Sequence, residues 1–294
     1  MKGRIIKGVA GEYEVYVEEK DRIYRCRAKG IFRKKGVKPL VGDQVLVEEI
    51  GENEGNITEI LPRKNELIRP QVSNVDACLV VFAWKNPDVS LGLLDRYLIQ
   101  MAQQNIPTIL CLNKSDLVSA EEQKEFMRIY RDFGGKLISI SCENGWNMDR
   151  ILDEIRGKTV VLAGPSGVGK SSLLNRLYPE AESKTGAISE KLKRGKHTTR
   201  HSEIFALGDH TYVLDTPGFG DAKILPLSKE ELKNYYPEFH PYEGMCRFSP
   251  CTHTHEPGCK IKEMVKDQGI SKERYDSYLL MYEEQKELEK RKYR

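Results

Sequence analysis

Short β-type runs separated by glycine turns fill the first part of the chain. Their apolar positions alternate with polar ones, as on strands that bury one face. Several short strands at this spacing predict a small closed barrel, and an OB-like barrel over residues 1–68 fits best. The predicted strands are Glu14–Val17, Ile23–Ala28, Gln44–Glu49 and Gly55–Ile60.

Continuous apolar runs alternate with helical stretches between residues 69 and 222. Uninterrupted apolar runs are typical of strands covered on both faces, and strand–helix alternation predicts a mostly parallel sheet in an α/β domain. The predicted strands are Ala77–Ala83, Thr108–Leu112, Lys136–Ser141 and Thr159–Ala163. The predicted helices are Gly92–Gln104, Ala120–Phe133 and Met148–Ile155.

The strand signal fades after residue 222. A Cys/His cluster and a charged segment, Lys272–Arg294, follow, and the segment predicts a solvated or docking helix. We therefore expect a third, mostly α-helical domain over residues 223–294. With 294 residues the chain is long enough for three domains with modest cores.

Composition and charge indicate the cellular compartment and the kind of partner to expect. The chain is 39% hydrophobic and 31% charged, and no apolar run is long enough to span a bilayer. Its N-terminus has no apolar core of a secretory signal, so we expect a cytoplasmic protein without a membrane partner, and nothing calls for more than a monomer. Arg22–Lys38 holds eight Lys or Arg, no acidic residue, and interleaved Tyr24 and Phe32. This pattern favours a polyanion partner over a merely solvated hairpin face.

A phosphate-binding loop follows the predicted strand at Thr159–Ala163. The run from Gly164 has the spacing Gly, four residues, Gly-Lys-Ser, and a predicted helix leaves it. Glycines let backbone N–H groups surround phosphates, Lys170 would bridge the β- and γ-phosphates, and Ser171 would bind magnesium. The predicted nucleotide contacts are Gly164, Pro165, Ser166, Gly167, Val168, Gly169, Lys170, Ser171 and Ser172.

Two further motifs follow predicted strands. In Asp215-Thr216-Pro217-Gly218, Asp215 would hold magnesium and the Gly218 N–H would contact the γ-phosphate, although such a tetrapeptide alone also suits a turn. In Asn113-Lys114-Ser115-Asp116, Asp116 would accept hydrogen bonds from guanine and Lys114 would pack along the base. The alternative role for Asp116 is to cap a helix. Ser141 and Cys142, in the loop after another strand, would contact the guanine carbonyl through backbone N–H groups.

These motifs form a GTPase set in an unusual order, because the guanine motif precedes the phosphate loop. A circularly permuted GTPase domain needs one sheet, whereas two unrelated half-sites would each need a sheet with too few strands. Phe219 stands where many G proteins place a water-orienting glutamine. A substitute is expected from elsewhere, and the basic stretch Lys184–Arg200 suits a switch loop. In it, Thr199 is the predicted magnesium ligand and Thr198 the alternative.

The clustered Cys246, Cys251 and Cys259 with nearby histidines predict a structural zinc site, and His253 and His255 compete for the fourth position. A reduced cluster without metal is the alternative. A full set of four ligands leaves no open position for catalysis.

The permuted order, the barrel and the Cys/His module together resemble the RsgA family, also called YjeQ or YloQ, of bacterial GTPases that depend on the small ribosomal subunit. The resemblance implies a GTPase that the subunit stimulates, rRNA binding and a late maturation checkpoint. It also implies His253 as the fourth zinc ligand and His197 as the catalytic residue, whose alternative is mere surface exposure. Competing functions are a nucleotide-gated RNA-binding factor, for which hydrolysis is only a reset, and a metabolic kinase.

Overall fold

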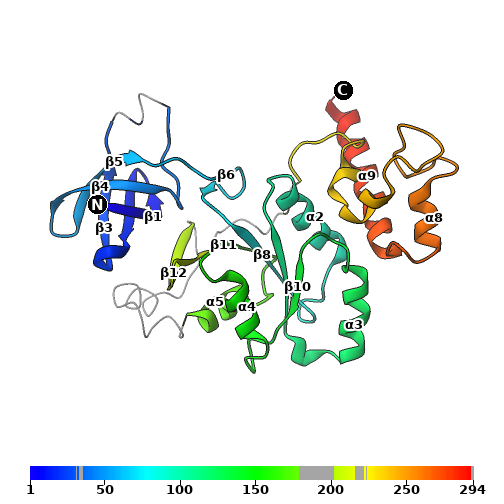
Figure 1. Cartoon of the computed structure of the whole chain (residues 1–294), viewed down its shortest axis with the longest axis horizontal. Helices are drawn as coiled ribbons and strands as arrows, with labels where there is room; N and C mark the ends of the chain where they lie inside the picture. The colour runs from blue at the N-terminus through cyan, green and yellow to red at the C-terminus, as the bar shows by residue number, and fades with distance from the viewer. Residues whose placement is uncertain (31, 33–35, 179–201, 216–221, 223, 293–294) are drawn as a thin grey trace.

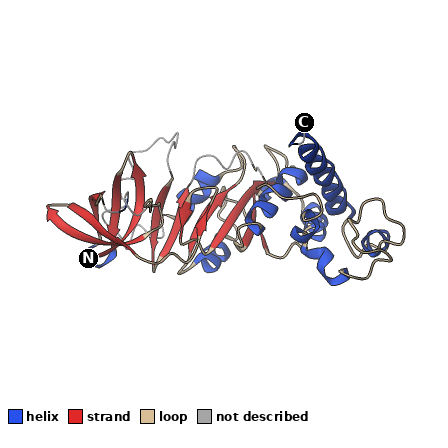
Figure 2. Cartoon of the chain, turned by 90° about the horizontal axis from the view of Figure 1, so that it is seen from above, coloured by secondary structure: helices blue, strands red, loops and turns tan. Residues whose placement is uncertain are grey.

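The structure is a computed structural model that describes residues 1–30, 32, 36–178, 202–215, 222 and 224–292. Three regions follow one another along the long axis: a β-barrel, a central α/β domain and a helical C-terminal module (Figure 1). Strands run from the barrel into the central domain, and helices make up most of the opposite end (Figure 2). Among the described helices, none combines the length and the apolar character that crossing a membrane requires.

The N-terminal region is a closed five-stranded barrel. Its order is β1-β2-β3-β5-β4, and pairing of β1 with β4 closes it. The sequence missed β1, because a register shift between Ile5 and Lys7 turns both Ile5 and Ile6 inward and breaks the alternation. The elements are β1 (Lys2–Val9), β2 (Glu12–Val17), η1 (Glu18–Lys20), β3 (Arg22–Ala28), β4 (Gln44–Gly51) and β5 (Glu54–Ile60).

The central domain is built on one sheet with the order β10-β9-β8-β11-β13-β12. All neighbours are parallel except β12, an unpredicted strand that also pairs with β1 at Lys7 and Glu203. The strands are β8 (Ala77–Ala83), β9 (Thr108–Asn113), β10 (Lys136–Ser139), β11 (Thr159–Ala163), β12 (Glu203–Gly208) and β13 (Thr211–Asp215). The helices are α2 (Leu91–Ala102), η2 (Ser115–Leu117), α3 (Ala120–Ile129), α4 (Met148–Ile155) and α5 (Lys170–Leu177), and β6 (Glu66–Leu67) pairs with β7 (Val72–Ser73) before them.

This single sheet decides between the two architectures that the motif order allowed. β9, which carries the guanine motif, and β11, which carries the phosphate loop, both pair with β8. Because these strands are parallel, their carboxyl ends meet at one edge, where ligands bind in open α/β sheets. The two motifs therefore belong to one permuted domain.

The C-terminal module consists of η3 (Leu232–Tyr235), η4 (Pro237–Tyr242), α8 (Lys260–Lys266) and α9 (Lys272–Lys292). The charged segment predicted as a solvated or docking helix docks, since Tyr278 and Met281 of α9 are buried. They share an apolar core with Ile99 of α2, although α2 belongs to the central domain. The sequence-based boundaries at residues 68/69 and 222/223 remain predictions.

Candidate nucleotide site and metal centre

The loop between β11 and α5 has the backbone that a phosphate cradle needs. Gly164, Gly167 and Gly169 have positive φ angles of 136°, 80° and 95°. A β-carbon on Gly164 would lie 2.0 Å from the Val81 carbonyl oxygen, and one on Gly169 would lie 2.2 Å from the Asn113 amide nitrogen. Glycine is therefore required at both positions, where the loop packs closely against neighbouring strands.

Lys170 points into this loop. Its Nζ donates hydrogen bonds of 2.7 Å to the carbonyl oxygens of Gly164 and Pro165. Burial lowers the pKa of Lys170, and the negative charge of Asp215 partly opposes that shift. A bound phosphate would add the anionic partner that a half-buried ammonium needs. Ser171 and Ser172 lie exposed in the first turn of α5.

Asn113 joins the guanine motif to the phosphate loop. Its side chain is buried, and its Nδ2 donates to the Val168 carbonyl oxygen at 2.9 Å. Its Oδ1 accepts from the N–H groups of Lys114, at 2.8 Å, and Cys142, at 3.1 Å. A buried amide that is satisfied on both ends holds its partners in one geometry. The structure thus gives Asn113 a positioning role between three loops.

The two charged residues of the guanine motif are less buried than Asn113. Lys114 has a left-handed backbone, and its Nζ donates to the carbonyl oxygens of Gly167, at 3.0 Å, and Asn86. Asp116 is exposed and accepts from the Ser141 hydroxyl at 2.5 Å. Helix α3 is capped instead by Ser119, in a capping box, so Asp116 is not its cap.

The loop after β10 differs in one respect from the sequence interpretation. The Ser141 N–H donates to the Trp146 carbonyl oxygen at 3.2 Å, and the Cys142 N–H donates to Asn113. Both amides predicted for the guanine carbonyl thus already have protein acceptors. Arg176 of α5, which no motif marks in the sequence, donates to the Cys142 carbonyl oxygen at 2.8 Å and to that of Glu143 at 2.7 Å. The loop is therefore held by Asn113 through the Cys142 N–H and by Arg176 through two carbonyl oxygens.

Asp215 ends β13 beside the phosphate loop. In the parallel pairing of β11 with β13, Leu162 lies opposite Asp215, so the carboxylate is at the same sheet edge as Gly164. The remaining predicted residues of this site, Gly218, Thr199 and His197, lie outside the described residues.

The Cys/His cluster of the C-terminal module brings four ligand atoms together. Those of Cys246, Cys251, His253 and Cys259 all lie within 4.8 Å of one another. The Nδ1 of His253 lies 3.6 Å from the Sγ of Cys246 and 3.5 Å from that of Cys259. His255 is exposed and contacts Thr254 instead. Geometry thus favours His253 over His255.

The chemistry of this cluster suits one structural zinc ion. Three sulfurs and one imidazole nitrogen form a full tetrahedral ligand set. Burial lowers the pKa of His253, which keeps the imidazole neutral and able to bind metal. Helix α9 supports the loop, since the Tyr275 hydroxyl donates to the His253 carbonyl oxygen at 2.7 Å and the Tyr278 hydroxyl donates to that of Thr252.

Family models match most of the chain. The model described as RsgA GTPase matches residues 60–225, and the model described as RsgA N-terminal domain matches residues 2–57. The chain belongs to the RsgA GTPase family. A bound guanine nucleotide in this family implies magnesium with it. Of the predicted magnesium ligands, Ser171 and Asp215 lie among the described residues.

Full-length relatives agree with this membership. A protein named small ribosomal subunit biogenesis GTPase RsgA from Agathobacter rectalis is 48% identical, covering 99% of this chain and 100% of the relative. One of the same name from Clostridium novyi is 45% identical over 97% of each chain. The crystal structure of YjeQ from Thermotoga maritima has a TM-score of 0.80 at 31% identity, covering 97% of this chain and 98% of that one. A structure described as YloQ, a circularly permuted GTPase, has a TM-score of 0.77 at 35% identity, covering 97% and 95%.

Proposed function

We propose that this protein hydrolyses GTP when it binds the small ribosomal subunit, and that it acts as a checkpoint factor late in that subunit's maturation. The observation that carries the proposal is the Asn113 side chain, which joins the guanine motif to the phosphate loop in one permuted sheet. The names of the full-length relatives supply the partner. We further propose that the protein acts in the cytoplasm, together with this partner, and as a monomer.

Each predicted residue has a definite task in this reaction. Asp116 selects guanine by accepting its two N–H donors, and Lys114 covers the base. Lys170 neutralises charge on the β- and γ-phosphates as the bond between them breaks. The Gly218 N–H contacts the γ-phosphate, and His197 orients the attacking water. Ser171, Thr199 and Asp215 would hold a magnesium ion, which would offset phosphate charge.

Two basic or metal-bearing surfaces are the proposed rRNA contacts. Arg25 and Arg27 lie exposed on β3 of the barrel, within the basic stretch that the sequence singles out. The loop of the zinc module carries Arg247 beside the exposed ring of Phe248. Cations next to aromatic rings suit a phosphate backbone with unstacked bases.

GTP turnover with and without purified small ribosomal subunits tests the proposal. An unassisted G protein typically turns over at about 10⁻⁴ to 10⁻² per second, and we expect subunits to raise the rate by at least tenfold. An unchanged rate would exclude the partner-dependent mechanism. A non-hydrolysable analogue that supported the full cellular role would show instead that cleavage is only a reset.

Two variants separate chemistry from binding. His197→Ala should abolish the stimulated rate while GTP affinity stays at the wild-type value, and retained stimulation would remove His197 from the mechanism.

Asp116→Ala should weaken GTP binding by about tenfold or more, because guanine then loses an acceptor for two N–H donors. Equal affinity of that variant for GTP would show that the base is read elsewhere.

A further inference from the structure

Two consecutive glutamines at the end of α2 bind the main chain of two segments that are far apart in sequence. Gln103 donates from Nε2 to the Leu225 carbonyl oxygen at 3.0 Å and accepts at Oε1 from the Leu225 N–H at 2.9 Å. Gln104 accepts at Oε1 from the Ile68 N–H at 2.8 Å and donates from Nε2 to the Arg69 carbonyl oxygen at 3.2 Å. In each glutamine, the amide nitrogen donates to a segment of main chain and the amide oxygen accepts from the same segment.

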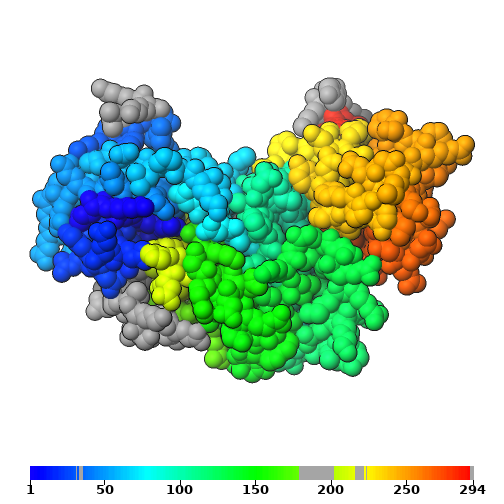
Figure 3. Space-filling model, viewed as in Figure 1, coloured from blue at the N-terminus to red at the C-terminus, as the bar shows by residue number. Residues whose placement is uncertain are grey.

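The two segments are the connections between the three regions. Ile68 and Arg69 lie where the chain passes from the barrel into the central domain. Leu225 lies where the chain passes from β13 into the C-terminal module, ten residues after Asp215. Both connections are therefore fastened to one helix end, which we call the α2 junction. The surface is hollowed between the barrel side and the C-terminal module, and the part coloured as α2 lies at the base of the hollow (Figure 3).

The face of α2 that carries Gln103 already faces the C-terminal module. Asp95, Ile99 and Gln103 are four residues apart and so lie on one side of the helix. Asp95 contacts Arg274 of α9, and Ile99 belongs to the module's core. Gln103 continues this contact to the connecting chain, and Gln104, one position on, turns toward the other connection.

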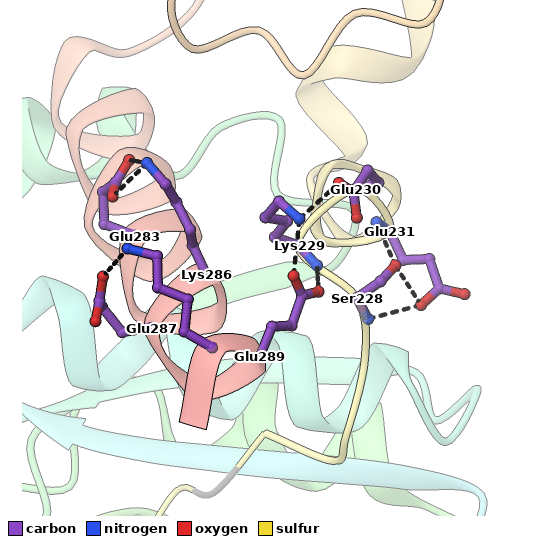
Figure 4. A network of polar contacts seen from close by, with 9 residues as sticks. Ser228, Lys229, Glu230, Glu231, Glu283, Lys286, Glu287 and Glu289 are labelled. Carbon is purple, nitrogen blue, oxygen red and sulfur yellow. Dashed lines mark hydrogen bonds and ion pairs between the residues drawn. The ribbon is translucent and has the colours of Figure 1, made fainter. Parts of the chain in front are cut away.

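The connection through Leu225 has a second anchor further along. Lys229 donates from its backbone N–H and its Nζ to the two carboxylate oxygens of Glu289 on α9, at 2.9 Å and 2.7 Å (Figure 4). The described chain after the Asp215 motif is thus fastened first to α2 and then to α9. Displacement at Leu225 would have to break the paired bonds to Gln103.

We propose that Gln103 and Gln104 are positioning residues that fix both connections at the α2 junction, so that the barrel and the zinc module meet a common partner in one geometry. The inference rests on the proposed function, in which both regions contact the small ribosomal subunit. Gln103 holds the chain that follows the magnesium ligand Asp215 and so acts on the stimulated rate. Gln104 holds the barrel connection and so acts on partner affinity.

Gln103→Leu and Gln104→Leu test this inference, and each is the matched control for the other. Leucine keeps a similar volume but forms no hydrogen bond. In Gln103→Leu the Leu225 amide should exchange hydrogen about tenfold faster, while the Ile68 amide keeps its wild-type rate. In Gln104→Leu the Ile68 amide should be released and the Leu225 amide protected. Gln103→Met and Gln104→Met serve as second variants if a leucine variant folds poorly.

The enzymatic readout separates the two roles. With saturating small subunits, Gln103→Leu should lower the maximal stimulated rate at least fivefold, whereas Gln104→Leu should mainly raise the subunit concentration needed for half-stimulation. Unstimulated turnover and GTP affinity should match the wild type in both variants. Wild-type stimulation in both variants, or unchanged exchange of both amides, would overturn the inference. Absence of stimulation in the wild-type protein would overturn the proposed function instead.

Discussion

The barrel and the C-terminal module are attached to the central domain in different ways. On the barrel side, β1 and β12 pair at Lys7 and Glu203 only. Arg4 adds a 2.7 Å hydrogen bond to the Thr159 hydroxyl and lies 4.1 Å from the centre of the Tyr212 ring. An open pocket of about 630 Å³ lies between the two regions and is lined in part by Arg4 and Tyr212. These direct contacts are polar, but the buried apolar residues of the barrel and of the central sheet also form one continuous cluster.

The C-terminal module is attached through a buried ion-pair network that includes residues of both the module and the central domain. The Arg274 guanidinium contacts Asp95 of α2 and Glu238 of the module, and all three side chains are nearly inaccessible to water. The same guanidinium lies 5.2 Å from the centre of the Tyr130 ring and 4.8 Å from that of Tyr236. Burial alone would lower the pKa of Arg274, but the charges of Asp95 and Glu238 outweigh it and hold the pKa above its usual value.

The difference shows which kind of contact holds each region to the central domain. The module has a core of its own, which Ile99 of α2 joins, and the buried pair of Arg274 with Asp95 fastens it to the central domain. The barrel is joined to the central domain by polar contacts and by a continuous apolar cluster that includes Ile5 of β1 and Val160 of β11. A partner that binds both ends would therefore meet two regions that different kinds of contact hold in place, and the following predictions test this contrast in decreasing order of effect.

Removal of zinc should have the largest effect, confined to the module. Structural zinc typically contributes on the order of 10 kcal/mol of apparent binding free energy that is coupled to folding. Chelation, or Cys259→Ala, should remove hydrogen-exchange protection around Tyr275 and Tyr278, whose hydroxyls bind the ligand loop. Barrel amides should keep their protection. Full protection at α9 after loss of zinc would show that the module folds without metal.

Arg274→Met should have the next largest effect, about 3–5 kcal/mol off the free energy of unfolding, because it leaves two buried carboxylates without their cation. Urea unfolding of the zinc-loaded protein measures it. Arg96→Met is the matched control on the same helix pair, since Arg96 contacts the half-exposed Glu284 and should contribute less than about 1 kcal/mol. Equal effects of the two variants would contradict the buried attachment.

The elements that the sequence predicted best are those whose pattern is local. Ala77–Ala83, Thr159–Ala163 and Met148–Ile155 were predicted with their observed bounds, since continuous apolar runs and a strong helical periodicity mark them. The sequence did not predict β1, because its register shift interrupts the alternation of apolar and polar positions. The sequence did not predict β12. This strand pairs with β13 on one side and with β1 of the barrel on the other, and its own residues do not indicate either neighbour.

The candidate site divides in the same way. Glycines and the lysine of the phosphate loop follow a contiguous motif, so their predicted placement needs no knowledge of the rest of the chain. The contacts of Asn113 with Val168 and Cys142, and of Arg176 with the same loop, join residues 29 to 55 positions apart. Such pairs depend on how the sheet assembles. The choice of His253 over His255 likewise required a resemblance or a structure.

Arg4→Met should have a moderate effect that is local to the barrel attachment. The variant loses a hydrogen bond and a cation–π contact, together about 1–2 kcal/mol. We expect faster hydrogen exchange in β1 and β12 and a larger radius of gyration by small-angle X-ray scattering. Hydrogen exchange in the module should be unchanged. Lys7→Met, which removes the partly exposed pair with Glu203, should have a smaller effect in the same measurements. Increased exchange at α9 would show that the two attachments are not separate.

Glu289→Gln should have the smallest effect, because both side chains of this anchor are partly exposed to water. The variant keeps an acceptor for the Lys229 N–H but loses the carboxylate charge, and we expect exchange at Lys229 to change about twofold or less. Glu289→Ala, which removes both acceptors, is the control that should change it more. Hydrogen bonding to Glu289 raises the pKa of Lys229 above its usual 10.5, so loss of the lysine charge removes the pair's contribution only above that pH. The difference between wild type and Glu289→Gln should therefore stay constant from about pH 6 to 9. A difference that varied within this range would show that another titrating group, and not Lys229, governs the anchor.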